Sequence, residues 1–131
     1  MIVKVILAVI FLFYFLMLLV ILFPMIEIVG DSMFPTYKNG ETLFGTRLYR
    51  KSHLKVGDVI LYQMNEEEDT RIVVKRIKHI RKHNGELQFF CVGDNSKNSY
   101  DSRYYGYVSS KQLVCKLINQ RSVKRDESYF V

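Results

Sequence analysis

The longest apolar run in the chain covers residues 5–23 and contains no charged side chain. As an α-helix rising about 1.5 Å per residue, it nearly matches the hydrocarbon thickness of a bilayer. A helix that is apolar on every side needs a large interior, and the remaining residues are too few to build one. The pattern therefore predicts a membrane-spanning anchor over residues 1–24.

A cleavable signal peptide is the alternative, because Lys4 followed by an apolar run is typical of such a peptide. Two features argue against cleavage: the run is longer than a usual signal core, and the sequence ILFPMIEIVG at its end lacks the pair of small residues that marks a processing site. We therefore expect the segment to be retained. Lys4 and the amino terminus would then lie on the cytoplasmic side.

Beyond the anchor, short β-prone runs alternate with turn residues, and no helical period lasts for three turns. This pattern predicts a mainly β domain over residues 25–131. Two Asn-Gly pairs, Asn39-Gly40 and Asn84-Gly85, predict tight turns in which both central residues have positive φ. We expect the charged stretch 65–69 to be a solvated loop and the tail from residue 121 to be a frayed end. The expected strands are 26–29, 42–47, 58–63, 71–82, 86–92 and 112–118.

The charge of the predicted domain limits its partners. All 13 acidic residues and 18 of the 19 basic residues follow residue 23, so this part carries a net charge of +5. Such a charge suits an anionic lipid surface, and it would also suit a nucleic acid. The chain has no recognition helix, aromatic-basic stripe or zinc-finger spacing, however, so we expect no nucleic-acid partner.

The two cysteines and the three histidines give no metal-ligand spacing. Cys91 and Cys115 each lie within an apolar run, which predicts buried thiols. If the domain is extracytoplasmic, a disulfide between the two cysteines is an alternative. We expect neither a metal nor another cofactor.

The stretch GDSMFPT places Ser32 in a Pro-containing turn a few residues beyond the anchor. A serine hydroxyl attacks a carbonyl group only if a nearby base takes its proton. On the strand RIVVKRIKHI, Lys75 would share one face with Val73, Ile77 and His79, because side chains alternate along a strand. If that face is buried, desolvation lowers the pKa of Lys75 and makes it a usable base.

Each of these residues also has a purely structural interpretation. Ser32 could cap a turn, Lys75 could be a lysine that protects an edge strand from pairing, and the segment DNSKNS could form side-chain turns. The same segment is faintly like a calcium-binding loop. Counted from Asp94, however, its sixth residue is Ser99 where glycine is needed, and its twelfth is Tyr105 where glutamate is needed.

Four segments, in order, resemble the bacterial Ser/Lys type I signal peptidases: GDSMFPT, LKVGDVI, RIVVKRI and VGDNSKNSYDSRYYGYV. These enzymes are membrane-anchored serine proteases that remove signal peptides from exported proteins. The resemblance implies a small β-domain, also found in SOS repressors, and cleavage after small residues of the Ala-x-Ala type. It covers nearly half of the predicted domain, and the last segment is its most specific part.

The resemblance also implies roles for individual residues. Ser32 would be the nucleophile and Lys75 the general base, and Ser99 would bind the lysine. Asp101 and Arg103 would brace the site, a role that suits the bidentate geometry of arginine. The other supporting residues that match these motifs are Gly30, Met33, Asp94 and Asn95.

Two departures from the larger relatives indicate a minimal form similar to the Gram-positive enzymes. Gly30 stands where many Gram-negative relatives have a hydroxyl residue that donates to the oxyanion, so the backbone N–H of Ser32 is the expected principal donor. The interval between the lysine strand and Gly93 holds only a hairpin, where larger relatives insert a second subdomain. Eukaryotic and archaeal relatives have histidine in place of Lys75, so the lysine indicates the bacterial branch.

The expected partners are signal peptides of exported preproteins and the lipid bilayer, with the secretion translocon open as a further partner. The catalytic domain would lie on the outer face of the cytoplasmic membrane. Phe34, beside Ser32, is the first candidate for an apolar contact with lipid. Two rivals are an SOS-repressor-like self-cleaving Ser/Lys protease and a pilus-assembly accessory on the same scaffold. The first lacks an anchor and the GDN segment; the second would be expected to have lost Ser32 or Lys75.

Overall fold

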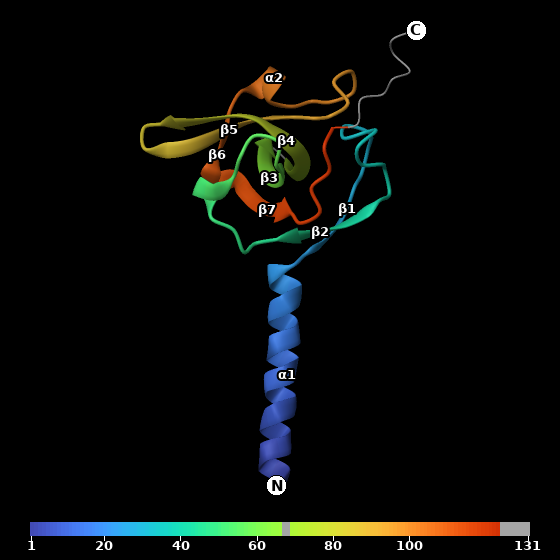
Figure 1. Ribbon diagram of the computed structural model, residues 1–131, viewed down its shortest axis with the longest axis vertical. Helices are drawn as coiled ribbons and strands as arrows, with labels where there is room; N and C mark the ends of the chain where they lie inside the picture. Colours follow the sequence, from blue (N-terminus) through green and yellow to red (C-terminus); the bar gives the residue numbers. More distant parts are fainter. Residues whose placement is uncertain (67–68, 124–131) are drawn as a thin grey trace.

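The computed structural model describes residues 1–66 and 69–123, and it consists of one long helix and one β-domain (Figure 1). Helix α1 (Ile2–Leu22) stands away from the domain, and none of its residues is buried. Its 21 residues correspond to about 32 Å at 1.5 Å per residue. Within the described residues, α1 is the one helix that is long and apolar enough to cross a membrane.

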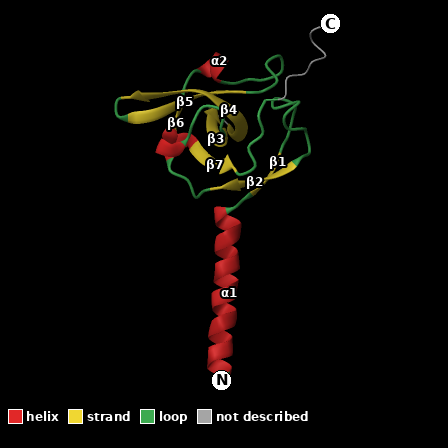
Figure 2. Cartoon of the chain, in the orientation of Figure 1, coloured by secondary structure: helices red, strands yellow, loops and turns green. Residues whose placement is uncertain are grey.

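The domain is a single antiparallel sheet with strand order β1-β2-β7-β3-β4-β5-β6 (Figure 2). Short helical segments lie in its connections: η1 (Lys51–His53), α2 (Ser102–Tyr105) and η2 (Ser110–Gln112). This architecture confirms the predicted fold class, a mainly β domain after an apolar helix. The strands are β1 (Met25–Glu27), β2 (Thr42–Thr46), β3 (Val59–Glu66), β4 (Asp69–His83), β5 (Glu86–Val92), β6 (Val108–Ser109) and β7 (Leu113–Leu117).

All six predicted strands are present with bounds shifted by three residues or fewer, and the two-residue strand β6 was not expected. The expectation of a solvated loop over 65–69 is wrong in part. Asn65 pairs with Thr70, and Glu66 pairs with Asp69, so the hairpin strands run into the charged stretch. Backbone pairing at the end of a hairpin does not depend on apolar side chains, and the pattern therefore missed it.

Strand β3 divides the core into two clusters because its side chains alternate between two faces. Val59 and Leu61 belong to the first cluster, which also contains residues of β1, β2 and β7. Ile60 and Tyr62 belong to the second, which contains residues of β4 and β5. Cys115 lies in the first cluster and Cys91 in the second, and both thiols are buried and free, as their apolar surroundings predicted.

The two Asn-Gly turns differ. Asn84 and Gly85 have φ values of 49° and 78° and connect β4 to β5, as predicted. At the other turn only Gly40 has positive φ, so the expectation for Asn39 is wrong. The Asn39 side chain instead accepts a hydrogen bond from the Gly30 N–H at 2.9 Å, which links this turn to the serine-bearing segment.

Candidate active site

The turn that carries Ser32 is fixed by its buried neighbours. Met33 and Tyr37 are almost completely inaccessible in the first core cluster, and the Tyr37 N–H donates to the Met33 carbonyl at 2.9 Å. Gly30 enters the turn with a φ of +84°, a value that residues with a Cβ rarely adopt. Ser32 is left half-buried at the surface of the domain.

Lys75 lies on β4 opposite Ile60, on the face that belongs to the second core cluster. Only 5% of its surface is exposed. Its predicted face-sharing neighbours Val73 and Ile77 pack against or belong to this cluster. No hydrogen bond or ion pair joins its amino group to another residue in the described ranges, which is unusual for a buried lysine.

Ser32 and Lys75 line one groove of about 270 Å³. The fold thus brings the two residues to one groove, although they lie 43 positions apart in the sequence. The rest of the lining is predominantly apolar, and the groove includes Glu27, Ile28, Val29, Met33, Ile72, Val73 and Val74.

Burial lowers the pKa of Lys75 from its ordinary value of 10.5. The carboxylate of Asp101 opposes this effect by raising the pKa, and the nearby Arg103 lowers it again. The net pKa is lowered, so the neutral amine is more abundant near neutral pH than for a free lysine.

His79 does not lie on the Lys75 face, and this prediction is wrong. Ile77 pairs with Cys91 and His79 pairs with Phe90, so a β-bulge leaves one extra residue on β4. The bulge shifts the alternation by one position and turns His79 outward, where its ring contacts Phe90. Ile80, opposite the buried Phe89, continues the core-facing side.

Asp101 is a fully buried carboxylate at the centre of a hydrogen-bond network. It accepts from Ser99 Oγ at 2.6 Å, from the Gly93 N–H at 2.8 Å, and from Arg103 Nε and Nη2 at 2.8 and 2.6 Å. Burial alone would raise the pKa of Asp101, but the bonds from Arg103, Ser99 and Gly93 outweigh it and hold the pKa well below its usual range. Asp101 is therefore a stable anion that fixes the Ser99 hydroxyl.

Gly93 lies close to Ser32, Ser99 and Asp101. A Cβ at this position would lie 2.2 Å from Ser99 Oγ and 2.5 Å from the Ser32 carbonyl oxygen. Neither distance is tolerable, so only glycine fits here. The same geometry places Ser99 close to the backbone of Ser32.

Asp94 and Asn95 connect the strand of Lys75 to the turn of Ser32. Asp94 accepts from Arg76 Nε and Nη2 at 2.8 and 2.7 Å, a bidentate pair next to Lys75 in the sequence. The Asn95 N–H donates to the Ser32 carbonyl at 2.9 Å, and Asn95 Nδ2 donates to the Asp31 carbonyl at 3.0 Å. The two residues thus fix the distance between the candidate base and the candidate nucleophile.

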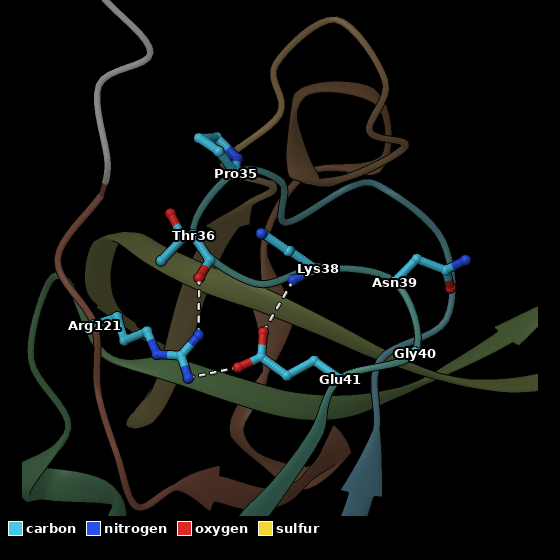
Figure 3. Close-up of a pocket in the computed structure, with 7 residues that line it drawn as sticks. All are labelled: Pro35, Thr36, Lys38, Asn39, Gly40, Glu41 and Arg121. Atoms are coloured by element: carbon cyan, nitrogen blue, oxygen red, sulfur yellow. Dashed lines mark hydrogen bonds and ion pairs between the residues drawn. The ribbon is translucent and has the colours of Figure 1, made fainter.

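A second hollow, of about 550 Å³, is lined by Arg121 and by residues that follow the serine turn, from Pro35 to Glu41 (Figure 3). Arg121 bridges its two sides by pairing with Glu41 and by donating to the Thr36 carbonyl at 3.2 Å. The Arg121 N–H also donates to the buried Tyr37 hydroxyl. The expectation of a frayed end from residue 121 is therefore wrong at its first residue, while 124–131 lie outside the described residues.

A hydroxyl, a buried amine with a lowered pKa and a fixed carboxylate form the elements of a serine hydrolase without histidine. The model for "Signal peptidase, peptidase S26" matches residues 1–80 and 81–119 of the chain. The chain belongs to this family of serine peptidases.

Its relatives include eukaryotic and bacterial proteins. The human signal peptidase complex catalytic subunit SEC11C is 32% identical over 80 residues, which are 61% of this chain and 40% of that protein. Signal peptidase I of Buchnera aphidicola subsp. Baizongia pistaciae is 31% identical over 70 residues, 53% of this chain and 19% of that protein. SEC11 of Debaryomyces hansenii is 28% identical over 99 residues, 76% of this chain and 53% of that protein. The chain thus spans about half or less of the length of these relatives.

Within this signal peptidase fold, several positioning residues were not identified from the sequence. Gly93 and Arg76 lie inside motifs that were recognised, but nothing in those motifs marked their positioning roles. Asn39 and Arg121 gave no comparable signal, because their partners are distant in the sequence or are backbone atoms. Among the described residues, no group of three or more His, Cys, Asp or Glu side chains could hold a metal ion.

Proposed function

We propose that this protein is a single-pass membrane endopeptidase that removes signal peptides from exported preproteins with a Ser32/Lys75 dyad. The observation that carries the proposal is the shared groove, which is lined by a half-buried serine and by a buried lysine with no hydrogen bond or ion pair in the described residues. A lysine used only to protect a strand edge would gain nothing from this burial.

In the proposed reaction, neutral Lys75 takes the proton of Ser32 Oγ as the oxygen attacks the scissile carbonyl carbon. The backbone N–H of Ser32 stabilises the negative charge that develops on the carbonyl oxygen. The Lys75 ammonium then gives its proton to the leaving amine, and an ester between Ser32 and the signal peptide remains. Lys75 next takes a proton from a water molecule as the water oxygen attacks this ester, and it returns the proton to Ser32 Oγ when the ester bond breaks, which restores both the serine and the neutral amine.

Ser99 is proposed to orient Lys75. A carboxylate without a proton can only accept hydrogen bonds, so the Ser99 hydroxyl donates its hydrogen to Asp101. The free lone pairs of Ser99 Oγ are then acceptors for an N–H of Lys75. A lysine held in this way turns its own lone pair toward Ser32, and Arg103 supports the arrangement by bracing Asp101.

The groove also suits an extended peptide. In the described residues β1 pairs with a strand on one side only, and residues 70–75 of β4 pair with β3 but not with β5. Both free edges border the groove. A substrate strand could hydrogen-bond to these edges, and the small apolar volume favours small side chains before the cut.

The proposed arrangement in the cell assigns residues 1–24 to an anchor and 25–131 to an extracytoplasmic catalytic domain. The exposed apolar helix supports a membrane location, and Lys4 supports a cytoplasmic amino terminus. Lys75 supports the bacterial Ser/Lys branch, and the short hairpin between β4 and β5 supports the minimal, Gram-positive-like form. A tether to the same bilayer raises the effective concentration of enzyme and substrate, with the translocon as a further candidate partner.

The test is cleavage of a preprotein with an Ala-x-Ala signal peptide by the full chain in lipid vesicles. Ser32→Ala should abolish cleavage and leave the domain folded, because the Ser32 hydroxyl has no hydrogen-bond partner within the described residues. Ser52→Ala, in the exposed segment η1, is the matched control and should cleave at the wild-type rate. Processing retained in Ser32→Ala would refute the proposed dyad and favour the accessory function.

A further inference from the structure

The carboxyl end of α1 is hydrogen-bonded to Arg47, the residue that follows strand β2, and is not followed by a free linker. The Arg47 N–H donates to the Leu22 carbonyl at 2.9 Å, and Arg47 Nη1 donates to the Ile21 carbonyl at 3.0 Å. Two residues further along the chain from Leu22, the Pro24 carbonyl accepts a hydrogen bond from the Gly45 N–H of β2 at 2.9 Å. In Figure 1, α1 ends directly beneath β2.

Arg47 meets a specific electrostatic need of the helix. The last carbonyls of an α-helix have no partner within the helix, and they form the negative end of its dipole. The last turn of α1 contains no basic residue of its own. Arg47, which is always protonated, supplies the missing cation from another element.

Strand β2, which lies next to the end of the helix, is packed tightly into the core. Gly45 lies so close to its neighbours that a Cβ there would be 2.8 Å from both Cys115 Sγ and Ile26 Cδ1. β2 also pairs with β1 on one side and with β7 on the other. The bonds from Arg47, the residue that follows β2, therefore connect the helix to the same sheet that carries Lys75.

We infer that Arg47 is a positioning residue that holds the groove at a fixed height and orientation above the bilayer. The functional consequence of this inference rests on the proposed function. If the connection is rigid, the only peptide bonds that can reach Ser32 are those at one distance from the membrane segment of the substrate. A flexible connection would let Ser32 reach several bonds. Arg47 would thus help to select the cleavage site without touching the substrate.

The first test measures the geometry and does not need activity. A donor dye on Tyr104→Cys reports the height of the domain, because Tyr104 is 70% exposed and lies in α2, at the end of the domain away from α1 (Figure 1). The native cysteines are buried and should not be labelled. Energy transfer to acceptors in the headgroup layer of lipid vesicles should show a broader or shifted distance distribution in Arg47→Gln. The exposed Arg50 has no described partner, and Arg50→Gln should leave the distribution unchanged.

The second test compares two substrates of the full chain in vesicles: a membrane-inserted preprotein, and a short soluble peptide with the same cleavage sequence. In Arg47→Gln, kcat/KM for the preprotein should fall about 3- to 10-fold and secondary cuts should appear, since one charge-assisted bond is lost. Cleavage of the peptide should be unchanged, which also shows that the domain is folded. Arg47→Lys, which retains the charge, should lie between Arg47→Gln and the wild type.

An unchanged distance distribution, or an equal loss with both substrates, would overturn the inference. If the wild type cleaves neither substrate, the proposed function fails. The distance measurement would still decide whether Arg47 fixes the domain above the bilayer.

Discussion

Lys75 and Arg76 are neighbours on β4, and both are buried basic residues. They differ in the partners that surround their side chains. Arg76 is paired with Asp94 through two hydrogen bonds and donates a third to the Gly57 carbonyl. Lys75 has no such partner and faces a groove with Ser32. A buried cation with a full set of partners keeps its charge, whereas one without partners favours its neutral form.

The pKa values follow this difference. Burial would lower the pKa of Arg76, but the hydrogen bonds and charge of Asp94 outweigh it, and the pKa is raised. Burial dominates at Lys75, and the pKa is lowered. One strand thus presents a permanent cation that fixes a loop and, one residue away, an amine that can act as a base.

The largest effect is expected when Lys75 is replaced by arginine, the residue type of its neighbour Arg76. Lys75→Arg should reduce kcat/KM for a preprotein by at least about 1,000-fold, because a guanidinium does not give up its proton. Lys78→Arg, at an exposed position of the same strand, is the matched control and should retain the wild-type value. Substantial activity in Lys75→Arg would mean that another residue is the base.

Removal of the hydroxyl proposed to orient Lys75 should have a smaller effect. Ser99→Ala should reduce kcat by about 10- to 1,000-fold with little change in KM, because it removes one orienting hydrogen bond and leaves the nucleophile and base in place. Ser96→Ala, in the same loop and exposed, serves as the control. A kcat equal to that of Ser96→Ala would remove Ser99 from the site.

Weakening of the ion pair between Arg76 and Asp94 should lower both the stability of the domain and its activity. Asp94→Asn should lower the free energy of unfolding by about 2 kcal/mol and reduce kcat about 10-fold, since the loop that contacts Ser32 is no longer fixed to β4. Asp58→Asn weakens the ion pair with Lys116, which does not line the groove. This control should lose stability but keep its kcat, and an equal loss of kcat in both variants would contradict a positioning role for Asp94.

The sequence predicted the sheet well because its strands depend on local patterns: alternating β-branched residues and the Asn84-Gly85 turn. It also placed Lys75 on the correct face of β4. It misplaced His79, because a bulge inserts one residue without any change in the apolar pattern. The pairs Arg76–Asp94 and Arg121–Glu41 were missed because they join distant segments, and local periodicity carries no information on such contacts.

The central claim, that neutral Lys75 is the base, is tested most directly by the pH dependence of kcat/KM in the wild type and in Arg103→Gln. A lysine whose folded pKa is lowered below 10.5 loses its proton as pH rises through that lower value, so activity should rise with pH and reach its plateau below 10.5. Arg103 lowers the pKa of Lys75, so its removal should move this acid limb to higher pH. An acid limb that stays in place in Arg103→Gln but moves in His79→Ala would contradict the account.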